Sequence, residues 1–172
     1  MLKPVEIRAA RLEDGGEILR CLAEAFDAYR DCYTPAAFAD TTLDPDTLQE
    51  RMQTMHILVA MQEGAVIGTV AGSHDGAEGH LRGMAVLPEF AGSGVAAMLL
   101  GEIENWLRNC GCSRVTLDTT EPLTRATKFY EKNGYSPSGR VTDFYGMPLI
   151  EYEKWLNAQP KILVSPSFKT NT

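Results

Sequence analysis

The chain has 172 residues, of which 44% are hydrophobic and 23% are charged. This composition is typical of a soluble globular domain with a hydrophobic core, and it excludes a chain that is mostly disordered. The formal net charge is -7 and the pI is about 5.0. Because nucleic acid is densely negative, this balance argues against it as a partner.

Targeting and metal-binding signals are weak. No apolar run approaches the ~20 residues of a membrane-spanning helix, and residues 1–8 contain no apolar signal core. The four cysteines, at positions 21, 32, 110 and 112, are too few for a structural zinc site unless His56, His74 or His80 contribute. We therefore expect reduced thiols, no metal, no membrane contact and a cytoplasmic location.

Alternation and helical spacing predict the elements in chain order. Residues 5–8 alternate apolar and polar, as in a half-buried strand. Asp14 and Glu17 match a capping box, so we expect a helix from there to about Asp31, and Pro35 interrupts the chain. The further expected elements are a helix at 45–52, a hairpin of 56–61 and 66–71, a polar loop at 72–79, a strand at 81–87, a helix from 95 to Gly111, a strand at 115–117, a helix at 124–132, and strands from 135 and over 149–155.

This order predicts a single domain of the α/β (α+β) class. Its sheet is expected to be mixed and mostly antiparallel, with helices on its faces. Residues 1–156 form the domain, and residues 157–172 form an exposed C-terminal tail.

A glycine-rich turn carries the first functional signal. Residues 84–97, MAVLPEFAGSGVAA, read as a strand, a proline stop, a turn and a helix start. Gly92 and Gly94 allow a close approach of the backbone, and the first amides of a helix have no internal partners. Together with the helix dipole, they suit a diphosphate. For this segment alone, tight packing of the turn is the simpler interpretation.

The same segment resembles motif A of the GNAT-type N-acetyltransferases. The pattern V-x-P-x-x-R/Q-G-x-G-x-G/A is matched by Val86, Pro88, Gly92, Gly94 and Ala96. Residues 126–135, ATKFYEKNGY, resemble motif B, A-x-x-F/L-Y-x-x-x-G-F/Y. Two motifs in the family's order are more specific than either alone, and the resemblance covers about residues 5–156.

The resemblance implies an acetyl-CoA site beside two splayed parallel strands, and an enzyme that transfers the acetyl group to a primary amine. The amine attacks the thioester directly, and Tyr130 protonates the leaving thiolate. In the family the strand binds the pantetheine arm through its backbone, and the turn holds the diphosphate. The implied cofactor-binding residues are Met84, Ala85, Val86, Ala91, Gly92, Ser93, Gly94, Val95, Ala96, Ala97 and Ala126.

Two positions depart from the family pattern. Ala91 stands where the family has Arg or Gln, so one cationic contact is missing. Leu123 replaces an asparagine that often begins motif B. Arg125 and Lys128 could supply positive charge to the phosphates, or they could be solvated charges on a helix surface. Tyr130 has a competing interpretation as a core residue.

The general base is not assigned. A primary amine is protonated at neutral pH and must lose a proton before it attacks. The position where many relatives carry a carboxylate is occupied here by Arg82, which cannot accept a proton. His80, Glu78 and His74 lie nearby, and each has a surface or loop role as its competing interpretation.

An acidic segment bears on the acceptor. Residues 13–50 contain ten acidic and two basic side chains. One hypothesis is a small cationic amine steered by Asp27, Asp31, Asp40 and Asp44, and the other is a solvated helix face. We expect a small-molecule amine acceptor, and the sequence leaves a homodimer open.

A second class of function is a non-catalytic acyl-CoA-binding module that acts as a sensor or an assembly partner. Such a module has no need of a proton donor beside the sulfur, so Tyr130 distinguishes the two. A nucleotide site of another kind is disfavoured, because there is no P-loop Gly-Lys-Ser/Thr and no G-x-G-x-x-G after an N-terminal strand.

Overall fold

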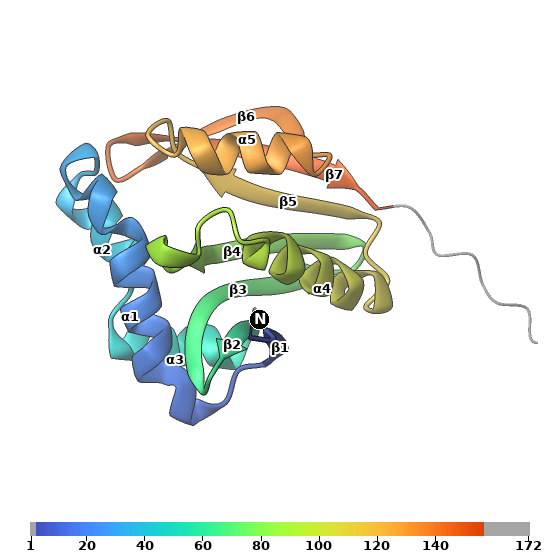
Figure 1. Ribbon diagram of the computed structural model, residues 1–172. Coiled ribbons are helices and arrows are strands. Elements are labelled where there is room, and N and C mark those ends of the chain that lie inside the picture. The colour runs from blue at the N-terminus through green and yellow to red at the C-terminus, as the bar shows by residue number, and fades with distance from the viewer. Residues whose placement is uncertain (1–2, 157–172) are drawn as a thin grey trace, which may run out of the picture.

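The computed structural model describes residues 3–156, which form one seven-stranded sheet and five α-helices (Figure 1). The elements are β1 (Glu6–Ala9), α1 (Gly15–Phe26), α2 (Pro35–Thr42), α3 (Pro45–Thr54), β2 (His56–Gln62), β3 (Ala65–Asp75), β4 (Glu78–Val86), α4 (Val95–Asn109), β5 (Arg114–Thr119), α5 (Thr124–Lys132), β6 (Ser136–Phe144) and β7 (Met147–Trp155). Short 3-10 helices cover Leu12–Asp14, Asp27–Cys32 and Pro88–Phe90.

The strand order is β1-β2-β3-β4-β5-β7-β6. Neighbouring strands are antiparallel except for β4 and β5, which are parallel and joined by α4 as a crossover helix. The predicted fold class, a single α/β domain with a mixed, mostly antiparallel sheet, is confirmed.

One face of the sheet is covered by α4 and α5, which lie in front of it in Figure 1. The contact with α4 is close because three strand positions on that face are glycines. A Cβ atom added at Gly68, Gly72 or Gly79 would lie 3.0 Å from side-chain carbons of α4. The glycines therefore let α4 bury its apolar stripe directly on β3 and β4.

The opposite face divides into an apolar and a polar part. Over β3 and β4 it is covered by α1, which also packs against α3, and Cys21 of α1 lies 4.0 Å from the carbonyl oxygen of Ala85. Toward β5, β7 and β6 the alternate positions of the strands carry polar side chains instead. No helix of residues 3–156 is both long and apolar enough to cross a membrane.

The predicted capping box at Asp14 and Glu17 is wrong. The Asp14 carboxylate accepts hydrogen bonds from the Arg8 guanidinium at 2.8 and 3.0 Å and from the Arg11 amide at 2.6 Å. Glu17 accepts the amide of Val66 at 3.0 Å. Asp14 is therefore held by β1 and by the turn before α1, Glu17 is held by β3, and the Asp14 side chain does not cap α1.

Three boundaries also differ from the expectation. The first α-helix ends at Phe26 and continues as a 3-10 helix to Cys32. Pro35 begins α2 rather than interrupting the chain, as suits proline in the first turn. The loop expected at 72–79 is mostly strand, because β3 and β4 extend to Asp75 and from Glu78. The expected tail, residues 157–172, lies outside the described residues.

Candidate functional site

The parallel strands β4 and β5 pair over only four residues each. The register runs from Glu78 with Arg114 to Leu81 with Leu117. Beyond that point β4 continues to Val86 and remains paired with β3, and β5 remains paired with β7. The facing edges of residues 82–86 and 118–119 therefore pair with no strand among residues 3–156, and backbone groups are available between them.

A β-bulge lies where the two strands separate. The register of β3 and β4 shifts between Thr69 and Ala71, which places one additional residue in β4. Gly83 has a φ of 61° there, and a Cβ atom at this position would lie 2.7 Å from Nη1 of Arg51. The positive φ favours glycine here, and a Cβ atom would also displace the end of the Arg51 side chain.

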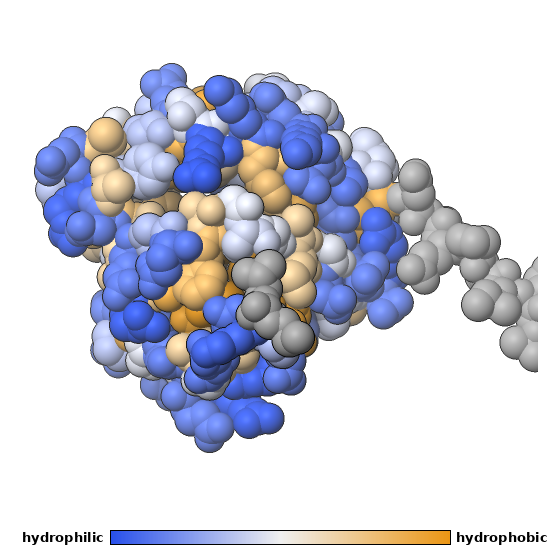
Figure 2. Space-filling model, viewed as in Figure 1, coloured by the Kyte–Doolittle hydropathy of each residue, from blue (hydrophilic) through white to orange (hydrophobic). Residues whose placement is uncertain are grey.

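The glycine turn after β4 and the start of α4 carry a group of unpaired amides. Gly92 and Gly94 have φ values of 75° and 92°. The Ser93 amide donates to the carbonyl of Phe90, so it is already used. In the described part of the chain, the amides of residues 92 and 94–97 donate to no other group. Figure 2 shows an apolar area on this face, between α1 and the N-terminal end of α4.

Arg125 brings a positive charge to this turn. A Cβ atom on Gly92 would lie 3.8 Å from the Nη2 atom of Arg125, which extends from the first turn of α5. Ala91 leaves the turn without the cation of the family pattern, and Arg125 approaches it from another element. A guanidinium at this distance is suited to binding phosphate oxygens.

Tyr130 lies on α5 within the main core. Its side chain is 8% exposed and packs edge-to-face with Phe129 and Tyr135. Its hydroxyl makes no hydrogen bond with any of residues 3–156, and burial raises the pKa of this phenol. At neutral pH the group is therefore a protonated donor without a partner. Ala126 lies one turn earlier in α5, partly buried against the core.

The predicted strand residues lie on β4 past the end of its pairing with β5. Ala85 is 4% exposed, and its side chain is buried, whereas Met84 and Val86 are half-buried. Only backbone groups of Ala85 could therefore meet a ligand. Along the chain, residues 84–86 lead through the 3-10 helix of Pro88–Phe90 to the glycine turn and the start of α4.

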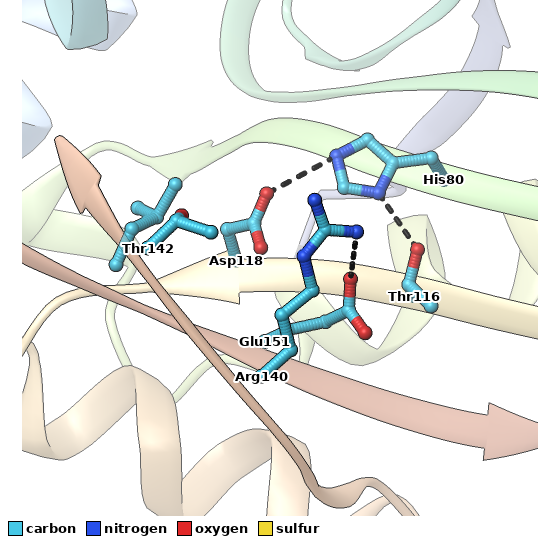
Figure 3. A pocket seen from close by; sticks show the side chains of 7 residues that line it. His80, Thr116, Asp118, Arg140, Thr142 and Glu151 are labelled. Atoms are coloured by element: carbon cyan, nitrogen blue, oxygen red, sulfur yellow. Dashed lines mark hydrogen bonds and ion pairs between the residues drawn. The ribbon is translucent and has the colours of Figure 1, made fainter.

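A cavity of about 260 Å³ lies on the other face of the sheet, which sequence reasoning missed (Figure 3). His80 and Asp118 project into it, and the Nε2 and Oδ2 atoms are 3.4 Å apart. The Nδ1 atom of His80 lies 2.8 Å from the hydroxyl oxygen of Thr116. The remaining lining residues are Arg140, Thr142, Leu149 and Glu151. Alternation in β5 puts residues 116 and 118 on one face, but no sequence signal identifies their partners on β4, β6 and β7.

The pKa values of His80 and Asp118 in this cavity are both shifted. Burial lowers the pKa of His80, and Asp118 and Glu151 oppose that effect while Arg82 adds to it. Burial raises the pKa of Asp118, and the neighbouring His80 opposes it. Both side chains are 31% exposed, so a ligand in the cavity can reach them.

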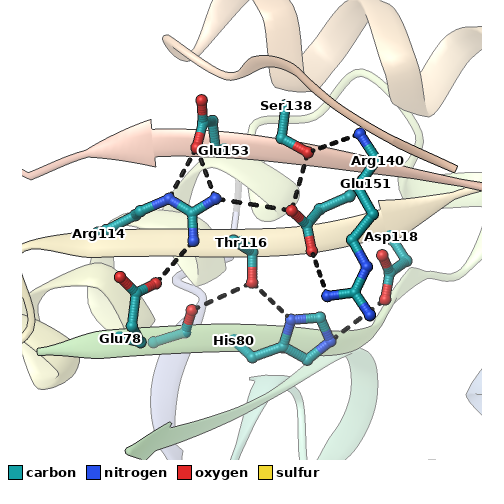
Figure 4. Close-up of polar contacts among 10 residues, drawn as sticks. Glu78, His80, Arg114, Thr116, Asp118, Ser138, Arg140, Glu151 and Glu153 are labelled. Atoms are coloured by element: carbon teal, nitrogen blue, oxygen red, sulfur yellow. Dashed lines mark hydrogen bonds and ion pairs between the residues drawn. The ribbon is translucent and has the colours of Figure 1, made fainter. Parts of the chain in front are cut away.

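An ion cluster fixes the paired ends of the strands next to this cavity (Figure 4). The Arg114 guanidinium donates to Glu78 of β4 at 2.8 Å and to Glu153 of β7 at 2.6 and 2.7 Å. It also lies 3.6 Å from Glu151. One arginine on β5 thus holds both neighbouring strands at one end, while β4 and β5 separate at the other.

The acidic residues predicted to steer a cation are mostly used locally. Asp27 pairs with Arg30 at 3.2 Å, and Asp44 caps α3 through the amide of Thr47 at 2.8 Å. Asp40 lies 3.5 Å from Arg82. Among residues 3–156 no three His, Cys, Asp or Glu side chains are placed to hold a metal ion.

A second, more open cavity of about 450 Å³ lies beside the first. Asp40 and Arg82 line it, together with Asp143, Phe144 and Tyr145. The two cavities are neighbours along β4, through residues 80 and 82, and along β6, through residues 142 and 143. The second cavity reaches α2 through Asp40, whereas the first contains Asp118, where β4 and β5 separate.

A central sheet with two separated parallel strands, beside unpaired amides at a helix start, defines a class of acyl-CoA-dependent transferases. The Acetyltransferase (GNAT) family model matches residues 22–135, which is well over half of the chain. The chain belongs to this family and is an acetyltransferase.

Solved structures share the fold at low sequence identity. The PaiA N-acetyltransferase of Thermoplasma acidophilum, in complex with coenzyme A, is similar with a TM-score of 0.76 and 19% identity, over 89% of this chain and 99% of that one. A ribosomal-protein-alanine N-acetyltransferase from Escherichia coli has a TM-score of 0.73 and 14% identity, over 93% and 99% of the two chains.

Proposed function

We propose that the protein transfers an acetyl group from acetyl-CoA to the primary amine of a small acceptor. The observation that carries this proposal is the unpaired edge of β4 at residues 82–86, which continues into the free amides of residues 92 and 94–97. The first can bind the amides of a pantetheine arm in an extended conformation, and the second can bind a diphosphate. Arg125 adds one positive charge to the diphosphate site.

The proposed reaction is a direct attack on the thioester. The amine nitrogen forms a bond to the acetyl carbon, and the C–S bond breaks as the tetrahedral intermediate collapses. Tyr130 gives its phenolic proton to the departing sulfur and recovers a proton released from the nitrogen. A phenol with a raised pKa is protonated at the start of each turnover, as this role requires.

The acceptor is proposed to reach the thioester from the polar face of the sheet. Tyr152 faces α5, and the neighbouring Glu151 points into the cavity on the other face. Tyr130 and the cavity therefore lie on opposite sides of the separated strands. Asp118 and Glu151 make the cavity favourable for a cationic amine, which supports a cationic acceptor better than Asp27 or Asp44 do.

Release of free thiol from acetyl-CoA, measured over a panel of polyamines, amino sugars, amino acids and peptide N-termini, tests this function. We expect turnover with at least one small amine and a preference for cationic acceptors at low salt. A protein that binds acetyl-CoA but acetylates no member of the panel would instead be the non-catalytic acyl-CoA-binding module. A preference for acidic acceptors would contradict the charge argument.

A further inference from the structure

We propose that His80 and Asp118 form an ammonium site in which His80 is the general base that deprotonates the acceptor amine, while Asp118 and Thr116 are positioning residues. This inference rests on the proposed function, because it concerns the acceptor half of the same site. The two sequence motifs leave the general base unassigned, because Arg82 occupies the position of the family carboxylate and cannot accept a proton. His80 would fill this role.

The position of the pair fits the chemistry. His80 pairs in register with Thr116, one residue before the last pair of β4 and β5, and Asp118 follows that last pair directly. Both side chains lie on the face opposite α5 and are 31% exposed to the cavity of about 260 Å³. An amine held between them would lie where the strands begin to separate, next to the proposed thioester position.

The proposed base is the tautomer of His80 that carries its proton on Nδ1. In this tautomer the Nδ1–H group donates to the Thr116 hydroxyl oxygen at 2.8 Å, and the Thr116 hydroxyl faces the carbonyl oxygen of Gly79 at 3.4 Å. The Nε2 atom then carries the free electron pair. Thr116 is 7% exposed, which keeps this contact away from solvent.

In this tautomer two acceptors, Nε2 of His80 and the carboxylate of Asp118, face each other. The Nε2 electron pair and the Asp118 carboxylate are 3.4 Å apart, which is longer than an ordinary hydrogen bond between them. An ammonium group has three N–H donors and satisfies both acceptors at once. After proton transfer, the same carboxylate stabilises the imidazolium that forms.

The charges that face His80 come from four strands. Asp118 on β5 and Glu151 on β7 favour its protonated form, whereas Arg82 on β4 disfavours it. Arg140 on β6 pairs with Glu151 at 4.0 Å and offsets part of the negative charge of that carboxylate. Burial keeps His80 neutral at neutral pH, so the base is ready before the acceptor binds.

The proton balance is complete. The ammonium transfers one proton to Nε2 of His80, from which it passes to solvent. The neutral amine forms the C–N bond, the C–S bond breaks, and the second proton lost from nitrogen replaces the one that Tyr130 gives to sulfur. The products are the amide, the free thiol of coenzyme A and one proton in solution.

The test compares His80→Gln with His74→Gln, a control on β3 whose ring lies against Trp106, away from the cavity. We expect His80→Gln to lower kcat about 100-fold for an alkylamine acceptor at neutral pH, with coenzyme A affinity unchanged by calorimetry. Its activity should recover as pH rises toward the pKa of the free amine. An acceptor that is already neutral at pH 7, such as an arylamine or a hydrazide, should lose less than about tenfold.

A structural role would lower the rates of both acceptors equally and leave the pH profile of the remaining activity unchanged, and either result would overturn the inference. So would full activity of His80→Gln. If the wild-type protein shows no turnover, the proposed function is wrong. If the wild-type protein is active and His80→Gln is equally active, only the assignment of His80 as the general base is wrong.

For Asp118→Asn, the titration of His80 is a readout that does not depend on activity, and KM for a cationic acceptor is one that does. Because Asp118 favours the imidazolium, this variant should lower the pKa of His80, followed by NMR of the imidazole signals, and should raise KM for a cationic acceptor. An unchanged His80 titration together with an unchanged KM would contradict the ammonium site.

Discussion

Removal of the Tyr130 hydroxyl distinguishes a catalytic role of this residue from a role in core packing. In Tyr130→Phe the ring keeps its contacts with Phe129 and Tyr135, at centroid distances of 5.4 and 5.8 Å. The lost hydroxyl has no hydrogen-bond partner among residues 3–156, so the free energy of unfolding should change by less than about 0.5 kcal/mol. If the phenol protonates the leaving thiolate, kcat should fall about 100-fold, which corresponds to about 2.7 kcal/mol of transition-state stabilisation.

Tyr135→Phe is the matched control, five residues away in the same aromatic cluster. Its hydroxyl donates to Oε1 of Glu104 at 2.9 Å, and Glu104 is 4% exposed. Glu104 retains Lys154, which lies 3.0 Å from both of its carboxylate oxygens. Loss of one hydrogen bond to a buried carboxylate should cost about 1.5–3 kcal/mol of stability and leave kcat within about twofold.

The two variants are compared by thiol release at saturating acetyl-CoA, by calorimetry with coenzyme A and by urea unfolding. We expect opposite patterns, with Tyr130→Phe defective in kcat alone and Tyr135→Phe defective in stability alone. If Tyr130→Phe loses stability as Tyr135→Phe does but keeps its kcat, Tyr130 is a core residue and the proposed proton donor is wrong.

Three further predictions concern the turn and the N-terminal ion pair. Arg125→Gln should weaken coenzyme A binding about tenfold in calorimetry and reduce its salt dependence, whereas Lys132→Gln, at the other end of α5, should do neither. Gly94→Ala places a side chain at a φ of 92°, which should cost about 1–2 kcal/mol of stability and weaken coenzyme A binding. An unchanged affinity for coenzyme A would argue against this turn as the diphosphate site. The hydrogen bond from Arg8 lowers the pKa of Asp14, so its stabilisation is present above the unfolded pKa of about 3.9 and is lost as pH falls through the folded value. Asp14→Asn should therefore unfold more easily near pH 7, with a smaller further loss in acid, and parallel acid-unfolding curves would contradict this.

The sequence predicts the parts of the site that depend on local conformation. A proline stop, two glycines and an apolar helix are consecutive residues, so the strand, the turn and the start of α4 can be inferred without the rest of the fold. The helix predicted at 124–132 agrees with α5 for the same reason. The order of the predicted elements gives the fold class, and the family resemblance adds the parallel strands; both are confirmed.

The cavity that we propose for the acceptor could not be predicted in this way because it depends on register. His80, Asp118, Arg140 and Glu151 come from four strands, and only the pairing of β4, β5, β7 and β6 brings them to one cavity. Arg125 is similar, since its approach to Gly92 joins residues 33 positions apart in sequence. The predicted capping box was wrong because the Asp14 carboxylate binds Arg8, which comes from a separate strand, and the Arg11 amide.

The central claim is that the first amides of α4 bind the diphosphate of coenzyme A, and calorimetry tests it directly. Titration with coenzyme A and, separately, with pantetheine compares ligands that share the thiol arm and differ in the nucleotide diphosphate. The account predicts one saturable site for coenzyme A per chain and binding of pantetheine at least about tenfold weaker. Equal affinity for the two ligands, or no heat with coenzyme A, would contradict it.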